Sequence, residues 1–236
     1  MTQPSGTDTV AGTPALSFPQ RLVGMLFSPR ATFESVVAYP KWLDVLVVVT
    51  VVLTAAWAVF LWSPIGSQAF IDQMISQAEK AGRPTDNLAG VFPFIRMVTL
   101  IAIPIVGPIF TVLIAGLLYG VFAVMGGGAT FKQVVSIVVH AGVVSALGQL
   151  VILVLNYVRG TMTSATNLSV FAPMLDETSF VYKLLSAIDL VWLWYLFILA
   201  MGLGVLYRRK TVTLATSFYV LYMVIAVIIA LVRRGA

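Results

Sequence analysis

The sequence of 236 residues is 60% hydrophobic and only 10% charged, with a mean hydropathy of +1.01. Soluble domains are about 45–50% apolar and about 25% charged, so the composition excludes an ordinary soluble fold. The net charge of +5 does not indicate nucleic-acid binding, because the 14 basic residues lie in loops and at helix ends without interleaved aromatics. The absence of cysteine excludes disulfides and thiolate metal sites.

Residues 1–26 form a polar segment whose first part is rich in Thr, Pro and Gly, and we expect a disordered tail there. The tail lacks a charged start followed by an apolar core, so we predict no cleaved signal peptide. Ser28-Pro29 then has the pattern of a helix start, with a capping residue followed by proline. Phe33, Val36 and Val37 follow it and predict a short amphipathic helix before the first membrane span.

Residues 27–236 are expected to form one all-α membrane domain, a polytopic bundle of five transmembrane helices. A helix needs about 20 apolar residues to cross a bilayer, and charged residues bound five segments that qualify. The predicted spans cover about 45–62, 97–125, 134–158, 184–207 and 212–232.

The connections between spans carry their own signals. Ser63-Pro64 predicts a second amphipathic helix, on the membrane surface or capping the bundle. Pro104 and Pro108 predict a kink in the second span, because proline cannot donate to the preceding turn. The third span opens with Thr130 and Gln133, a capping-box pattern.

Two pairs of small residues at four-residue spacing indicate close packing of helices inside the bundle. The pairs are Gly116 with Gly120 and Gly142 with Ala146.

The orientation follows from the distribution of Lys and Arg. The totals on the two sides tie at seven, but three positive charges are concentrated in the tight turn Arg208-Arg209-Lys210. Because positive charges in short loops favour the cytoplasmic side, we expect the N-terminus to be cytoplasmic.

Four polar residues within the spans are candidate functional residues: Asp189, His140, Asn156 and Gln149. A carboxylate inside a span costs about 2.5–3.5 kcal/mol at the helix centre, so Asp189 needs a partner or a function. We expect a structural partner, with a proton- or ion-relay role as the alternative. The expected partners are Asn156, Arg159, Arg96 or Lys183.

His140 is the single histidine, and we expect a hydrogen bond inside the bundle, to Thr213, Thr216 or Tyr119. Ser136 lies one helical turn before it, but no nucleophile elbow surrounds this serine. One histidine without cysteine makes a zinc site implausible. We therefore expect no catalytic, cofactor-binding or metal-binding residues.

Several stretches resemble the Yip-one family of five-span membrane proteins, named for binding Ypt/Rab GTPases, and in particular its bacterial branch. They are residues 27–34, 40–43 and 128–133, Ile188-Asp189-Leu190 leading to Trp194, and Gly202-Leu203-Gly204. The resemblance implies a cytosolic N-terminus. The tyrosine-containing motif of the eukaryotic members is absent from residues 1–20, so binding of a Rab-type GTPase is not supported.

The sequence favours a non-enzymatic membrane protein, because no convergent polar constellation lies at mid-membrane depth. Its expected partners are membrane lipids, which it would organise or remodel, or a membrane protein or second copy of the chain. The alternative is a small transporter or channel that uses the polar residues of the spans. A bacterial cytoplasmic (inner) membrane is the expected location.

Overall fold

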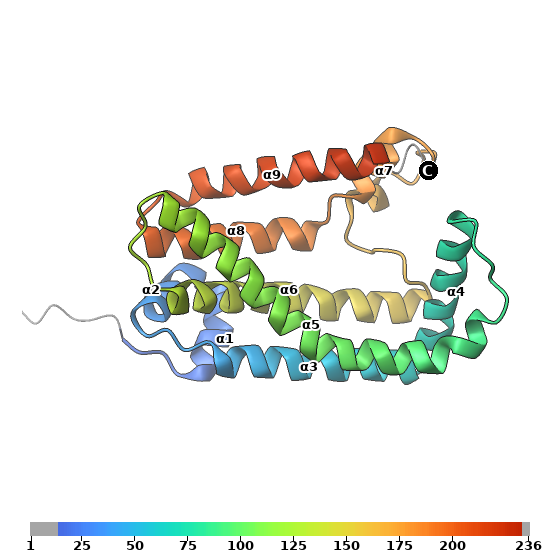
Figure 1. Cartoon of the computed structure of the whole chain (residues 1–236), viewed down its shortest axis with the longest axis horizontal. Helices are drawn as coiled ribbons and strands as arrows, with labels where there is room; N and C mark the ends of the chain where they lie inside the picture. Colours follow the sequence, from blue (N-terminus) through green and yellow to red (C-terminus); the bar gives the residue numbers. More distant parts are fainter. Residues whose placement is uncertain (1–13, 233–236) are drawn as a thin grey trace, which may run out of the picture.

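The computed structural model describes residues 14–232, and these residues form helices without strands. The helices are α1 (Phe18–Phe27), α2 (Pro29–Ala38), α3 (Leu43–Trp62), α4 (Pro64–Lys80), α5 (Leu88–Val124), α6 (Phe131–Arg159), the 3-10 helix η1 (Leu168–Phe171), α7 (Phe180–Ser186), α8 (Leu190–Tyr207) and α9 (Thr211–Val232) (Figure 1). The all-α prediction is confirmed.

Five helices are long and apolar enough to cross a membrane, as the sequence predicts: α3, α5, α6, α8 and α9. They run side by side along the long axis of the molecule (Figure 1). One end of the bundle carries α1, α2 and the turns that join α5 to α6 and α8 to α9, and is called the N-terminal end here. The opposite end carries α4, α7 and the end of α9.

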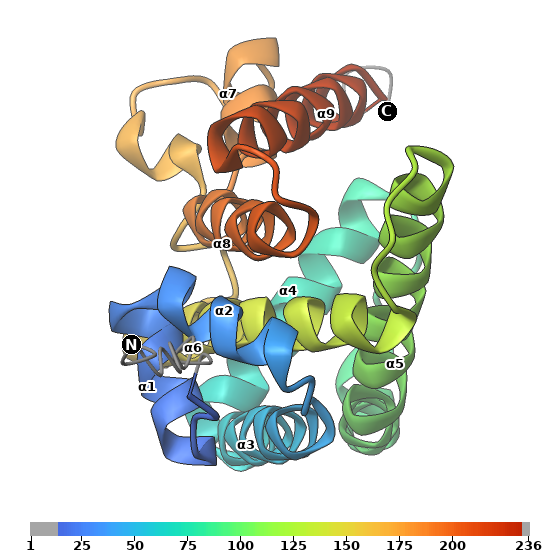
Figure 2. The ribbon, with the colours of Figure 1, turned by 90° about the vertical axis from the view of Figure 1, so that its left-hand side faces the viewer.

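The most buried span, α6, is the centre of the bundle. It packs against α3, α5 and α8, and the view along the bundle places it between α3 and α8 (Figure 2). Its first half supplies a continuous run of buried residues, 134–141, to the main core. The sequence explains this position, because the run contains small and β-branched side chains that let neighbouring helices approach.

Part of the expected tail is helical, so the sequence-based boundary at residue 26 is wrong. Residues Phe18–Phe27 form α1, and the main-chain amide of Ser17 donates to Gln20 Oε1 over 2.9 Å at its start. Met25 and Arg21 are buried against the bundle. Tertiary packing accounts for the helix, which is too short to be stable alone. The remainder of the expected tail, residues 1–13, lies outside the described residues.

Both Ser-Pro pairs begin helices where they were expected to do so, at α2 and α4. In α4, the Ser63 hydroxyl accepts a hydrogen bond from the Gly66 amide. In the core, α2 packs across α6 and α8, where Phe33 is fully buried. A Cβ atom at Gly202 of α8 would lie 2.8 Å from the Phe33 ring, so glycine is what allows this contact.

The second span differs from its prediction in length. It begins at Leu88 rather than at residue 97, and its 37 residues contain Pro104 and Pro108 in the interior. Figure 1 shows α5 changing direction part-way along its length, in agreement with proline removing a backbone donor.

The expected packing role of the small-residue pairs is wrong. A Cβ atom at Gly116, Gly120 or Gly142 would meet no atom within 4 Å. These three glycines therefore make no close contact with a neighbouring helix.

The fourth span begins later than predicted, at Leu190 rather than at residue 184. The preceding residues form the separate helix α7, and a loop turn at 187–189 joins the two. Main-chain hydrogen bonds fix that turn: Leu168 N donates to Ile188 O and Leu190 N to Thr166 O. Asp189 therefore lies at the N-cap of α8 and not inside the span.

Candidate functional site

The Asp189 carboxylate caps α8 and binds the loop that follows α6. Its Oδ1 accepts hydrogen bonds from the amides of Val191 (2.8 Å) and Trp192 (3.3 Å), and its Oδ2 accepts from the hydroxyls of Thr166 and Ser164. A carboxylate also interacts favourably with the positive end of the helix dipole. Its partners in the described chain are thus amides and hydroxyls, and the expected Asn156, Arg96 and Arg159 are not among them.

Three of the four candidate residues line one polar pocket of about 290 Å³: Gln149, Asn156 and Asp189. Asn156 is 4% exposed, and exchanging its amide oxygen and nitrogen lets the nitrogen donate to the main-chain oxygens of Thr161 (3.3 Å) and Thr163 (3.2 Å), the assignment that satisfies both amide atoms. Gln149 has no hydrogen-bond partner among residues 14–232. The pocket therefore offers one uncommitted amide beside two polar groups that the fold already uses.

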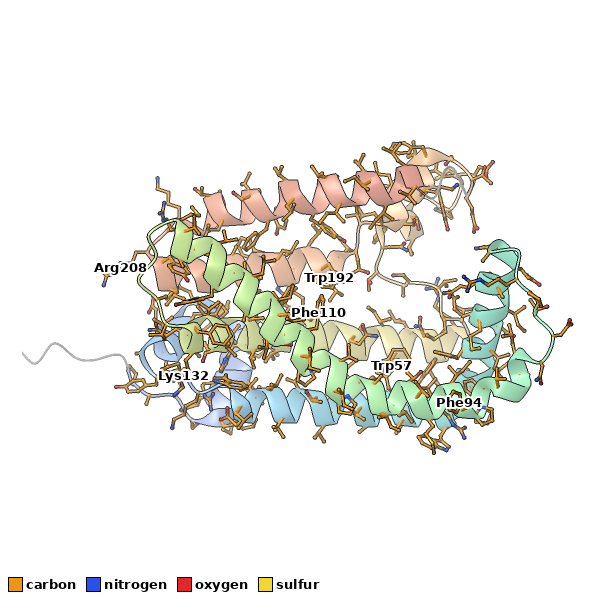
Figure 3. All side chains as sticks on the ribbon, viewed as in Figure 1. Trp57, Phe94, Phe110, Lys132, Trp192 and Arg208 are labelled. Atoms are coloured by element: carbon orange, nitrogen blue, oxygen red, sulfur yellow. The ribbon has the colours of Figure 1, made fainter. Side chains whose placement is uncertain are left out.

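An apolar cavity of about 440 Å³ adjoins this polar pocket inside the bundle. Residues of α3, α5, α6, α8 and α9 line it, and Ser145, Gln149 and Trp192 line both spaces. Phe110 and Leu221 at its edge are 55% and 59% exposed, so the cavity reaches the surface that faces the hydrocarbon. Figure 3 shows Phe110 on α5 and Trp192 on α8, between which the cavity lies. The two spaces together form an amphipathic site, apolar along the spans and polar at the end near Asp189.

His140 lies apart from these residues, in a charged cluster at the N-terminal end. Its Nε2 is 3.2 Å from a guanidinium nitrogen of Arg21, which also donates to the Lys41 carbonyl (2.8 Å) and pairs with Asp44. The expected partners Thr213, Thr216 and Tyr119 are wrong, because Arg21 of α1 and the Ser136 carbonyl occupy the two ring nitrogens of His140. The cluster joins α1, α3 and α6.

The geometry assigns the tautomer of His140. Arg21 can only donate, so Nε2 must accept; the Ser136 carbonyl, 2.7 Å from Nδ1, can only accept, so Nδ1 carries the proton. The imidazole is therefore neutral, and both nitrogens are occupied. The Ser136 hydroxyl donates to the Lys132 carbonyl over 2.8 Å, so it is directed at its own helix backbone rather than at the imidazole.

The Yip1 domain family matches residues 23–232, nearly the whole chain. The chain belongs to this family. Searches of curated proteins and of solved structures found no match. With five spans of sufficient length and apolarity, this Yip1-domain chain is an integral membrane protein.

The stretches that resemble the Yip-one family have structural roles in this Yip1 domain. Phe33 packs against Gly202, and Asp189 caps α8. Thr130 and Gln133 form the predicted capping box, and the Gln133 side chain also donates to Val37 O over 3.1 Å. These motifs therefore hold α2 and the loop after α6 against the spans.

Arg21, two residues before the part of the chain that matches the Yip1 domain family, is the residue that sequence reasoning missed. Its partners lie 23 and 119 residues away, so no local pattern indicates the contact. The one available signal was the Ser17-to-Gln20 spacing, a capping-box pattern that predicts a helix containing Arg21. Within the described residues, no three His, Asp or Glu side chains lie close enough to hold a metal ion.

Proposed function

We propose that this Yip1-domain chain is a non-enzymatic membrane protein that holds lipid acyl chains in its bundle and so organises the surrounding bilayer. The apolar cavity between α3, α5, α6, α8 and α9 is the observation that carries the proposal. Its volume of about 440 Å³ lies in the range of small-molecule binding pockets, roughly 300–1,000 Å³.

An acyl chain suits this cavity physically. Moving a lipid tail from the bilayer into the cavity gains no hydrophobic free energy, because the surrounding lipid is equally apolar. Close packing against the cavity walls is therefore what selects a tail. The cavity supplies walls on several sides, and each pair of carbon atoms that packs at van der Waals distance contributes about 0.1–0.2 kcal/mol. The uncommitted Gln149 amide at the polar end can bond an ester or headgroup oxygen.

Filling the cavity tests the proposal. A Cβ atom at Gly142, which lines the cavity, would meet nothing within 4 Å, so Gly142→Leu projects into the space without a clash. Losing the dispersion energy of roughly six carbon pairs between lipid and wall should lower the fraction of lipid-bound protein about fivefold. Native mass spectrometry of detergent-purified protein titrated with dioleoyl phosphatidylcholine measures this fraction.

Gly120→Leu is the matched control, since a Cβ there is equally unobstructed but Gly120 does not line the cavity. It should leave lipid binding unchanged. Equal lipid binding by Gly142→Leu and Gly120→Leu would contradict the proposal that the cavity holds an acyl chain.

The positions of the polar residues favour lipid binding over transport. Gln149 and His140 are nine residues apart on α6, about 13 Å along the helix axis. The α6 residues that line the cavity between them are Gly142, Ser145 and Ala146, so a single hydroxyl of this helix is available to an ion or proton over that distance. The non-enzymatic part of the proposal is supported by His140, whose ring nitrogens are both engaged.

We also propose that the N-terminal end faces the cytoplasm of a bacterial cell, with the chain in the cytoplasmic (inner) membrane. The Arg208-Arg209-Lys210 turn supports this orientation. Because the chain has no cysteine, single-cysteine labelling gives a clean readout. A membrane-impermeant maleimide should label Arg83→Cys in intact cells and Lys210→Cys only after permeabilisation; the reverse pattern would refute the orientation.

A further inference from the structure

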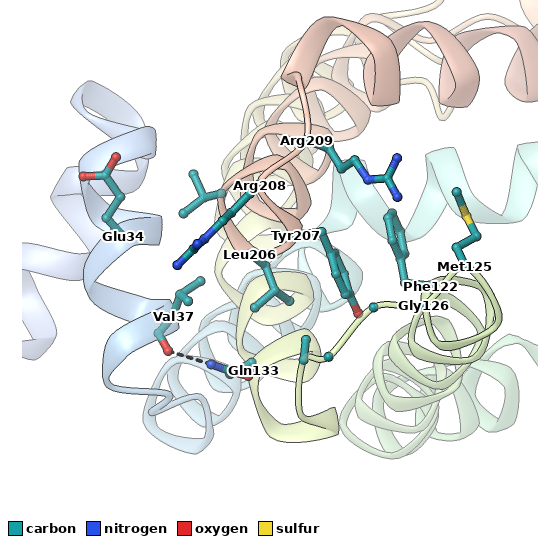
Figure 4. Close-up of a pocket in the computed structure, with 14 residues that line it drawn as sticks. Glu34, Val37, Phe122, Met125, Gly126, Gln133, Leu206, Tyr207, Arg208 and Arg209 are labelled. Carbon is teal, nitrogen blue, oxygen red and sulfur yellow. Dashed lines mark hydrogen bonds between the residues drawn. The ribbon is translucent and has the colours of Figure 1, made fainter.

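A pocket of about 660 Å³ opens at the N-terminal end of the bundle, at the depth where short turns join the spans. It lies between α2, the turn that joins α5 to α6, and the turn that joins α8 to α9 (Figure 4). Phe122 and Tyr207 stack beside it, with ring centroids 4.1 Å apart and an interplanar angle of 6°. The pocket is separate from the acyl-chain cavity, with which it shares no lining residue.

Two guanidinium groups line this pocket. Figure 4 shows Arg208 directed toward α2 and Arg209 toward the end of α5, so the two side chains flank the space. Both side chains are exposed, and neither forms a hydrogen bond or ion pair with any residue between 14 and 232. The one acid that lines the pocket, Glu34, pairs with Arg30 over 3.5 Å.

The backbone of Arg208 supports a role for its side chain. Arg208 terminates α8 with φ +53°, the left-handed conformation that helix ends usually give to glycine. A side chain there costs about 1 kcal/mol relative to glycine. The fold requires the conformation at this turn but does not require an arginine.

Backbone donors complete the lining. The amides of Gly128 and Ala129 make no hydrogen bond within the described chain, and both residues line the pocket. Gly127 lets this turn approach α8, because a Cβ atom there would lie 2.6 Å from the Tyr207 ring. Two guanidiniums and free amides form a donor set that matches the oxygens of a phosphate.

The charge of the whole N-terminal end agrees with an anionic ligand at a membrane surface. In the described chain this end has seven basic and two acidic residues, whereas the opposite end has five basic and six acidic residues. The basic residues of the N-terminal end are Arg21, Arg30, Lys41, Lys132, Arg208, Arg209 and Lys210. Basic clusters at the membrane surface attract anionic lipids by about 1 kcal/mol per charge.

We propose that this pocket binds the phosphate of an anionic phospholipid headgroup, with Arg208 and Arg209 as its ligands. The inference deepens the proposed lipid-organising function, on which it rests, by naming the lipid class. The lipid phosphate would lie at headgroup depth, where Arg208 and Arg209 can contact it without leaving the interface.

The test titrates the full chain in detergent with dioctanoyl phosphatidylglycerol, dioctanoyl phosphatidylcholine or inorganic phosphate, measured by microscale thermophoresis. Wild-type protein should bind phosphatidylglycerol about tenfold more tightly than phosphatidylcholine. Arg208→Gly keeps the turn conformation and should weaken phosphatidylglycerol binding about tenfold, the loss expected for one charge-assisted contact. Arg209→Gln should weaken phosphatidylglycerol binding by a similar factor. If Arg208→Gly does not fold, Arg209→Gln alone tests whether this pocket binds the phosphate.

Lys210→Gln is the matched control, because Lys210 belongs to the same turn but does not line the pocket. It should weaken phosphatidylglycerol binding less than either arginine variant, by at most about fivefold, the contribution of one unspecific charge at the membrane surface. Unchanged phosphatidylglycerol affinity in Arg208→Gly and Arg209→Gln would overturn the inference, and so would binding of inorganic phosphate as tight as that of the lipid. Gly142→Leu blocks only the acyl-chain cavity, and the arginine variants change only the headgroup pocket. Failure of the proposed acyl-chain binding and failure of the proposed headgroup binding are therefore observed separately.

Discussion

Replacing Arg21 by alanine is expected to destabilise the protein by about 2–3 kcal/mol, the largest effect of any single charged residue in the bundle. The Arg21 side chain is 5% exposed, and its removal leaves the Nε2 acceptor of buried His140 without its donor and Asp44 with only the Val45 amide. Asp44 is 41% exposed and can recover water, so the loss stays below that of a fully buried ion pair. Thermal unfolding in detergent, followed by circular dichroism, measures the change.

Two further variants show whether the loss of stability comes from the contacts of Arg21 rather than from removing a positive charge. Arg30→Ala removes an exposed pair with Glu34 and should cost no more than about 0.5 kcal/mol. Arg21→Lys keeps the charge but cannot bond Asp44, Lys41 O and His140 together, so it should recover only part of the loss. If Arg21→Ala were as stable as Arg30→Ala, α1 would not be held by this cluster.

A leucine at Gly202 is expected to displace α2 from the bundle. A Cβ atom at this position would lie 2.6 Å from Ile137 and 2.8 Å from Phe33, both fully buried. Overpacking of a closed core costs about 1–3 kcal/mol, and a branched side chain at such distances belongs at the upper limit. The free energy of unfolding measured in a denaturant titration in mixed micelles should fall by about 3 kcal/mol.

Gly116→Leu is the matched control for Gly202→Leu, because a Cβ at Gly116 meets no atom within 4 Å. It adds the same apolar side chain to a span and should leave the stability of the bundle unchanged or slightly higher. Equal stabilities of the two variants would mean that α2 does not pack on α8 through Phe33.

The features that local sequence determines were predictable. Bilayer-length apolar segments gave the five spans. Ser63 and Thr130 marked helix starts because capping depends on residues three positions apart, and Pro29 marked the start of α2 because proline suits the first helical position. Asp189 was misplaced by sequence reasoning, because the segment from 184 to 207 is apolar apart from this residue. The turn before α8 is fixed by main-chain bonds to Thr166 and Leu168, about 20 residues earlier.

Sequence reasoning also could not predict which candidate site residues lie together, because that depends on contacts between segments far apart in the chain. Gln149 and Asn156 share a face of α6 because they are seven residues apart, which the sequence shows. That Asp189 lines their pocket, and that His140 does not, depends on how α8 and α1 pack on α6. Such contacts are set by complementary shape across the bundle, for which a single sequence carries no local signal.

The Arg21 cluster imposes an order on how the chain matures. Its guanidinium belongs to α1, yet one of its partners, His140, is synthesised 119 residues later, in the third membrane segment. Until that segment is inserted, Arg21 can engage only Asp44 and the Lys41 carbonyl, and α1 lacks the surface of α6 on which it is buried. Although α1 precedes all five spans in the sequence, it therefore docks only after the third span is in place, and its attachment reports that the centre of the bundle has been assembled.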